Sequence, residues 1–207
     1  MTSTTLRELG QESTTPAALG RATVILVDYQ NTYTQGVMEL DGWEAALAEA
    51  SALLERARTA GSTVIHVVHD GGPGSPYDLD QEVGRIHPAV APVDGEDVVV
   101  KTAPNAFVGT RLGDLVDAAG NTEVVIAGFM THMCVTFTAE GALLRGNAPT
   151  VVARACATRS LPSVAGPVAS EELHRAALAT IGDVYGVVVD RVSDLSGEES
   201  LGQEPSA

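Results

Sequence analysis

The sequence has few cysteines, few aromatic residues and few basic residues, and each shortage limits the structure or the partners that the protein can have. Its two cysteines, Cys134 and Cys156, are too few and too far apart for a disulfide framework or a thiolate metal site. Aromatic residues make up 4% of the chain, so alanine and valine must supply most of the packing. The 12 Lys and Arg residues face 27 Asp and Glu residues, a net charge of −15. This charge argues against nucleic acid or an anionic membrane surface as a partner.

Long apolar runs and targeting signals are also missing. No uninterrupted run approaches the roughly 20 apolar residues that a membrane helix needs. Residues 1–20 lack the basic and apolar regions of a signal peptide. We therefore expect a soluble protein of a reducing compartment, the cytoplasm. The length favours one domain, which we place at residues 21–194, between a polar arm over 1–20 and a polar tail over 195–207.

The chain does contain a regular alternation of strand-like and helix-like segments. Helical spacing of apolar residues predicts a helix over 42–60, with Asp41 as its N-cap and Gly61 as its end. Further helices are expected over 109–120, from Cys134 to about 146, and over 169–181. Short β-branched runs predict six strands, at 23–27, 63–68, 98–100, 123–127, 149–153 and 186–189. This order predicts an α/β fold: a three-layer α/β/α sandwich with a mainly parallel six-stranded sheet.

Three of the predicted strands end in residues of complementary chemistry, Asp28, Lys101 and Cys134. Because the carboxyl ends of parallel strands meet at one edge of the sheet, these residues can converge there. A carboxylate can act as a base toward a thiol, and an ammonium group stabilises both anions. The start of a helix favours a thiolate, which predicts a pKa for Cys134 below the ~8.5 of free cysteine. Each residue alone has a plainer explanation: a loop cap, a surface lysine and a small buried side chain.

Asp28, Lys101 and Cys134 each lie in a longer characteristic stretch. The stretches are residues 26–31, residues 100–101 with 105–110, and residues 127–128, 131 and 134–135 with 138–139. Together they resemble the isochorismatase-like cysteine hydrolase superfamily, which includes nicotinamidase and N-carbamoylsarcosine amidohydrolase. The resemblance covers roughly residues 21–192 and implies that family's Rossmann-like hydrolase fold. It implies Asp28 as general base, Lys101 as its electrostatic partner, and Cys134 as a nucleophile that forms a thioester and releases ammonia or an amine.

The resemblance also implies how a substrate would be held. Family members have a cis peptide bond at the position of Phe129-Met130, which would aim the backbone N–H groups of Met130 and Cys134 at one oxyanion. The residues expected to line the substrate pocket lie just beyond strand ends, and they are Tyr29, Tyr33, Phe107, Thr131 and His132.

Departures from the family narrow the function. Nicotinamidases bind a metal through Asp-x-His and a further His, whereas here Asp70 is followed by two glycines and the loop beyond it offers His87 alone. We therefore predict no metal site and no cofactor. His66 and His69 are three residues apart on a strand, so they point to opposite faces, and core or loop-capping roles are favoured over a shared ion. Isochorismatases proper act on a vinyl ether and lack the cysteine, so Cys134 favours C–N chemistry. Cys156 is expected to be structural.

The sequence thus predicts a cysteine-dependent amidohydrolase that cleaves a non-peptide C–N bond of a small, uncharged or weakly charged amide. The alternative is a catalytically silent ligand-binding or scaffold protein on the same fold. A dinucleotide-dependent oxidoreductase is disfavoured because no strand is followed by Gly-x-Gly-x-x-Gly. The resemblance implies a homo-oligomer, since such assemblies are usual in the family.

Overall fold

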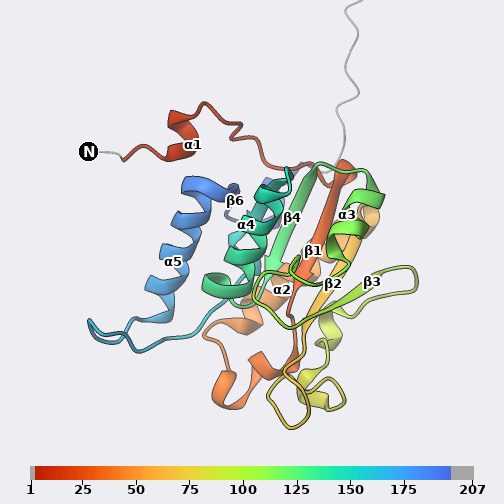
Figure 1. Cartoon of the computed structure of the whole chain (residues 1–207), viewed down its shortest axis with the longest axis vertical. Coiled ribbons are helices and arrows are strands. Elements are labelled where there is room, and N and C mark those ends of the chain that lie inside the picture. The colour runs from red at the N-terminus through yellow and green to blue at the C-terminus, as the bar shows by residue number, and fades with distance from the viewer. Residues whose placement is uncertain (1–2, 197–207) are drawn as a thin grey trace, which may run out of the picture.

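The computed structural model describes residues 3–196, and within them six strands form one fully parallel sheet. The spatial order is β3-β2-β1-β4-β5-β6, which places β1 and β4 at the centre (Figure 1). This confirms the predicted α/β sandwich with its parallel sheet. The strands are β1 (Ala22–Val27), β2 (Thr63–His69), β3 (Asp97–Lys101), β4 (Glu123–Gly128), β5 (Ala148–Val152) and β6 (Val187–Val189).

Helices cover both faces of the sheet (Figure 1). Alternate side chains of the central strands point to opposite faces, so each face has its own apolar core. In β1, Leu26 packs in the cluster that contains α2, whereas Ile25 packs in the cluster that contains α3 and α4. The helices are α1 (Leu6–Leu9), α2 (Trp43–Thr59), α3 (Leu112–Ala119), α4 (Thr136–Leu144) and α5 (Ser170–Thr180). None of the helices within residues 3–196 is long and apolar enough to cross a bilayer.

Two helix starts differ from the sequence prediction. Helix α2 has Gly42, and not Asp41, at its N-cap, and Gly42 takes a left-handed φ of 74° that favours glycine. Cys134 does not lie in the first turn of α4. It belongs to a separate π-helical turn over Thr131–Val135 that joins β4 to α4. The cysteine is therefore positioned by a wider turn than the periodicity of the apolar residues indicated.

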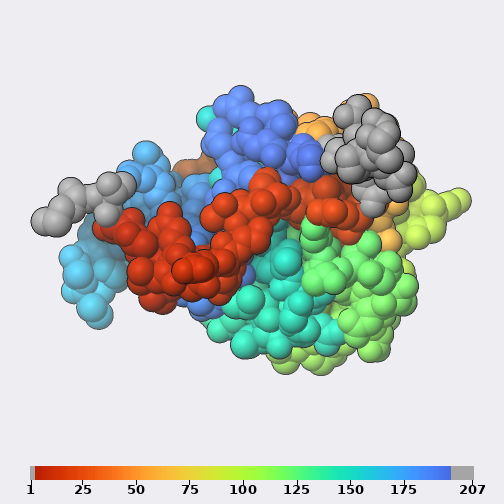
Figure 2. Space-filling model, turned by 90° about the horizontal axis from the view of Figure 1, so that it is seen from above, coloured from red at the N-terminus to blue at the C-terminus, as the bar shows by residue number. Residues whose placement is uncertain are grey.

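The N-terminal arm lies at the amino end of the sheet. The Leu6 N–H donates to Asp183 Oδ1 at 2.8 Å, and the Ala17 N–H donates to Thr150 Oγ1 at 2.9 Å. Figure 2 shows the arm, in red, running across this end of the molecule. Strand ends at the opposite edge are thus free of the arm. The division into arm, domain and tail stays a prediction, and residues 1–2 and 197–207 of the arm and tail lie outside the described residues.

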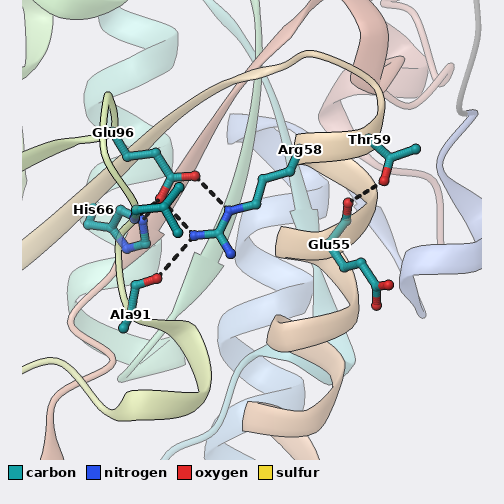
Figure 3. Close-up of polar contacts among 7 residues, drawn as sticks. Glu55, Arg58, Thr59, His66, Ala91 and Glu96 are labelled. Carbon is teal, nitrogen blue, oxygen red and sulfur yellow. Dashed lines mark hydrogen bonds and ion pairs between the residues drawn. The ribbon is translucent and has the colours of Figure 1, made fainter.

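A partly buried carboxylate, Glu96, links α2 to the sheet (Figure 3). Glu96 accepts hydrogen bonds from Arg58 Nε at 2.7 Å and from the Val93 N–H at 3.0 Å, and it lies 2.9 Å from His66 Nε2. Burial alone would raise the pKa of Glu96, but these hydrogen bonds outweigh it and lower the pKa to about 2. Burial also lowers the pKa of His66. His66 is therefore a core histidine, as predicted from its place on the strand.

Candidate active site

The side chains of Asp28, Lys101 and Cys134 meet at the carboxyl edge of the sheet. Asp28 follows β1, Lys101 is the last residue of β3, and Cys134 lies in the turn after β4. Lys101 Nζ lies 2.7 Å from Asp28 Oδ2 and 3.3 Å from Cys134 Sγ. The three residues are exposed by 0%, 1% and 6%. The structure thus brings together the three residues that the strand ends predicted, while their catalytic roles stay a prediction.

The electrostatics of this cluster differ from the sequence expectation. Burial, and then the charge of Asp28, raise the pKa of Cys134 to about 12, and Lys101 opposes them. The prediction of a lowered pKa is wrong because the thiol lies in a dry site beside a carboxylate rather than at an exposed helix start. Burial also raises the pKa of Asp28, against the pull of Lys101. The resting form is therefore a neutral thiol, with a carboxylate next to it that can take its proton.

The turn that carries Cys134 depends on a close approach at Gly128. A Cβ atom on this residue would lie 2.1 Å from the carbonyl oxygen of Val27, so no larger side chain fits. The next residue donates its N–H to the same Val27 oxygen at 2.9 Å, and the Phe129-Met130 peptide bond is cis. Within residues 3–196 the Met130 N–H has no hydrogen-bond acceptor. It remains available as a donor near Cys134, as an oxyanion site requires.

Two of the predicted pocket residues, Tyr29 and Tyr33, are buried tyrosines with different contacts. Tyr33 is buried, and its hydroxyl oxygen lies 3.2 Å from that of Tyr77. Burial raises the pKa of Tyr33, and the charge of Asp28 adds to this effect. Tyr29 instead points into the core, where its ring packs edge-on against Phe129 and its hydroxyl donates to the Ala155 carbonyl oxygen. Tyr33 therefore lies next to the cluster, whereas Tyr29 packs against Phe129 in the core.

The other predicted pocket residues face different ways. Thr131 Oγ1 donates to the Ala157 carbonyl oxygen at 3.1 Å and lies 2.9 Å from His174 Nδ1, so its hydroxyl links this turn to residue 157 and to α5. His132 Nδ1 lies 2.5 Å from Thr158 Oγ1.

Phe107 is partly buried and packs against the apolar core that contains Cys134, with the Arg145 guanidinium 5.5 Å above its ring. Its place in a substrate pocket stays a prediction.

Three residues that sequence reasoning did not assign lie close to this group. His69 Nδ1 lies 3.3 Å from Lys101 Nζ, and its ring packs on Tyr77 with the centroids 4.9 Å apart. The charge of Arg159 contributes to the lowered pKa of His132, after burial, and its Nε is buried with no hydrogen-bond partner among the described residues. A signal for His69 existed: it ends β2, directly beside Lys101 in the parallel register.

A cavity of about 530 Å³ lies between the start of α2, residues 154–158 and the start of α5. His174, Thr158 and Cys156 are in its wall, whereas Asp28, Lys101 and Cys134 are not. Cys156 is buried and donates its thiol proton to the Val152 carbonyl oxygen at 3.3 Å. This contact gives Cys156 a structural place away from the candidate nucleophile.

Residues 3–196 contain no group of three or more His, Cys, Asp or Glu side chains arranged to hold a metal ion. His87, the histidine of the long loop, accepts a hydrogen bond from the Ala89 N–H through Nδ1 at 3.2 Å and so caps its own turn. The absence of a cofactor stays a prediction.

Comparison with known proteins places this geometry in a family. Residues 22–192 match the family model of the isochorismatase domain. The chain belongs to the isochorismatase family. A crystal structure of an isochorismatase from Pseudomonas putida KT2440 superposes with a TM-score of 0.91, at 32% identity over 94% of this chain and 100% of that one. The family match agrees with the predicted resemblance and with the observed order of the strands.

Relatives in this family carry different names. A secreted isochorismatase effector of Verticillium dahliae is 32% identical over 80% of this chain and 86% of its own length. A streptothricin hydrolase of Streptomyces noursei is 36% identical over 80% of this chain and 61% of its own length. A maleamate amidohydrolase of Pseudomonas putida is 32% identical over 81% of this chain and 82% of its own length.

Proposed function

We propose that this protein is a cysteine-dependent amidohydrolase that cleaves a non-peptide C–N bond of a small amide. The observation that carries the proposal is the position of Lys101 Nζ, which contacts both Asp28 Oδ2 and Cys134 Sγ in a buried site. Family membership supports a hydrolase, and the amidohydrolase relatives support C–N bonds other than peptide bonds as its target. The cysteine mechanism is our inference from the three side chains.

The first half of the reaction transfers the acyl group to sulfur. Asp28 takes the thiol proton as Cys134 Sγ bonds to the amide carbon, because a thiol with a pKa of about 12 does not ionise alone near neutral pH. The carbonyl electron pair moves to oxygen, where the Met130 and Cys134 N–H groups stabilise it. Collapse of this intermediate breaks the C–N bond, and the proton held by Asp28 passes to the departing nitrogen.

The second half returns the enzyme to its starting state. A water molecule gives a proton to Asp28 and bonds to the thioester carbon, and the C–S bond then breaks. The proton returns to sulfur, leaving a carboxylic acid and the resting thiol. Throughout, Lys101 keeps a positive charge between two groups that become negative in turn, which lowers the cost of each anion in a dry site.

The surroundings indicate the size and charge of the substrate. Since Asp28 and Lys101 are buried and Cys134 is 6% exposed, the group that reaches the sulfur must be small. The Arg159 guanidinium places a positive charge near Tyr77 and His132, and its Nε has no hydrogen-bond partner among the described residues. After burial, this charge is the second cause of the lowered pKa of His132. This charge disfavours cationic amides. A neutral amide, or one with a single carboxylate, fits these surroundings best.

The test is an ammonia-release screen over small amides and ureas, arranged as matched pairs with and without a carboxylate. The proposal predicts turnover of at least one compound by the native chain and none by Cys134→Ser. Cys156→Ser is the matched control and should keep its activity. If no compound is hydrolysed although the panel binds, the alternative of a silent ligand-binding protein replaces the proposal.

Cytoplasmic location, assembly as a homo-oligomer, and the lack of nucleic-acid or membrane partners belong to the same proposal. Light scattering on the purified chain measures the assembly directly.

A further inference from the structure

The ammonium group of Lys101 has one ion-pair partner and two hydrogen-bond partners around it. They are Asp28 Oδ2 at 2.7 Å, Cys134 Sγ at 3.3 Å and His69 Nδ1 at 3.3 Å. The lysine side chain is buried, so a donor without a partner would carry a large desolvation penalty. The proposed chemistry uses the first two acceptors and leaves the histidine unexplained.

His69 is held both at its backbone and at its ring. The His69 N–H donates to Gln30 Oε1, and Gln30 Nε2 donates to the His69 carbonyl oxygen, both at 2.9 Å. Tyr77 packs edge-on against the ring with an interplanar angle of 79°. Tyr33 in turn holds the Tyr77 hydroxyl. An acceptor held this firmly can set the position of the lysine it contacts.

Charge decides the form of this histidine. An ammonium group only donates, so Nδ1 must be the unprotonated nitrogen and Nε2 must carry the hydrogen. Burial, and then the Lys101 charge, lower the pKa of His69, while Asp70 opposes them. The other titratable groups that face the ring are the Tyr77 phenol and, beyond Lys101, Asp28 and Cys134. The ring is therefore neutral near pH 7.

We propose that His69 is a positioning residue that accepts a hydrogen bond from Lys101 Nζ and so holds the ammonium group beside Asp28 and Cys134. The inference rests on the proposed function for its effect on turnover. It also has a consequence at low pH. Protonation of the ring would remove the acceptor and bring two cations to within 3.3 Å of each other, which would push Lys101 out of place.

His66 provides the matched control. It lies on the same strand, is buried, and contacts a carboxylate, but it points to the other face and lies 2.9 Å from Glu96. Loss of His66 removes a core interaction of a similar kind without touching Lys101. A comparison of the two histidines therefore separates positioning of the lysine from general support of β2.

The experiment compares His69→Leu, His69→Asn and His66→Leu in a Cys156→Ser background, so that Cys134 is the one thiol left. Leucine keeps bulk without an acceptor, whereas asparagine returns an oxygen at the position of Nδ1 that cannot be protonated. Three quantities are measured: thermal unfolding, the rate at which iodoacetamide modifies Cys134, and kcat and KM for an amide found in the screen.

We expect His69→Leu to lower kcat by about 10- to 100-fold with little change in KM, and to slow the modification of Cys134. In the native chain, protonation of the His69 ring should slow the modification of Cys134 as the pH falls. His69→Asn should recover most of both rates and should lack this additional slowing at low pH. His66→Leu should lower the unfolding temperature and leave both rates near those of the background. Equal losses of kcat and of the Cys134 modification rate in His69→Leu and His69→Asn would overturn the proposal. An effect of His69→Leu confined to KM would also overturn it.

A spectroscopic measurement separates this inference from the proposed function. Nitrogen chemical shifts of the His69 ring should show hydrogen on Nε2 and a bare Nδ1 at pH 7, and a ring with hydrogen on Nδ1 contradicts the proposal. If the native chain hydrolyses no amide, the proposed function fails, whereas the modification rates and the ring tautomer still decide the role of His69.

Discussion

Lys101 and Asp28 form a buried ion pair, with Nζ 2.7 Å from Oδ2 and both side chains closed to solvent. The two residues are 73 positions apart and come from the ends of two strands that are not neighbours in the sheet. A buried pair contributes little net stability, because desolvation offsets most of the attraction. The chemistry proposed for the neighbouring thiol gives a better reason for a buried pair at this place.

The ion pair yields a prediction that separates stability from activity. Lys101→Met or Asp28→Asn should each lower the free energy of unfolding by about 3–5 kcal/mol, because each leaves the other group buried without its partner. The double variant should recover part of this loss, and all three should lack amidase activity. Urea unfolding and the ammonia assay measure the two effects.

A surface pair serves as the control. Arg111 Nη2 lies 2.8 Å from Asp97 Oδ1 with both side chains largely exposed, so Arg111→Met should cost no more than about 1 kcal/mol. Single variants of Asp28 or Lys101 as stable as the native chain would show that the buried pair does not exist in solution.

The carboxylate of Glu96 makes stability depend on pH. Its pKa lies at about 2, below the 4.5 of a free glutamate, so its contribution is complete above 4.5 and is lost as the pH falls toward 2. Glu96→Gln should lower the free energy of unfolding by about 1–3 kcal/mol at pH 7, with a smaller difference from the native chain at pH 3.

Glu82→Gln is the matched variant, because its 3.6 Å pair with Arg85 lies on the surface. It should change stability little at either pH. A constant difference between Glu96→Gln and the native chain from pH 7 to pH 3 would contradict the assigned pKa.

The close approach at Gly128 predicts a site where one methyl group is not tolerated. Gly128→Ala should destabilise the fold by about 3 kcal/mol or more, because the added carbon meets the Val27 carbonyl oxygen. Gly182→Ala is the control, since its nearest neighbour would be Val188 Cγ2 at 3.7 Å, and it should change stability by less than about 1 kcal/mol. Similar unfolding midpoints for the two variants would argue against this geometry of the turn.

The fold could be predicted because its signals are local. The run from Thr23 to Val27 is β-branched and apolar, and the observed strand β1 begins one residue earlier. Asp28, Lys101 and Cys134 could be grouped because parallel strands place their carboxyl ends at one edge. Strand order and side-chain period carry this information without any knowledge of the loops.

The parts that were missed depend on contacts between distant segments. His69 could be placed on a strand, but its contact with Lys101 requires the register between β2 and β3, and its contact with Tyr77 requires the path of the following loop. The raised pKa of Cys134 follows from burial, which a sequence pattern does not measure. Phe107 was expected beyond a strand end, but its contact with Arg145 depends on where α4 ends, which the sequence pattern does not show.

The most direct test of the central claim, that Cys134 is the nucleophile, is inactivation by iodoacetamide with peptide mapping of the same samples. Activity should fall in proportion to the modification of Cys134, while Cys156 stays unmodified and Cys156→Ser remains active. Equal modification of both cysteines, together with full activity in Cys134→Ser, would contradict it.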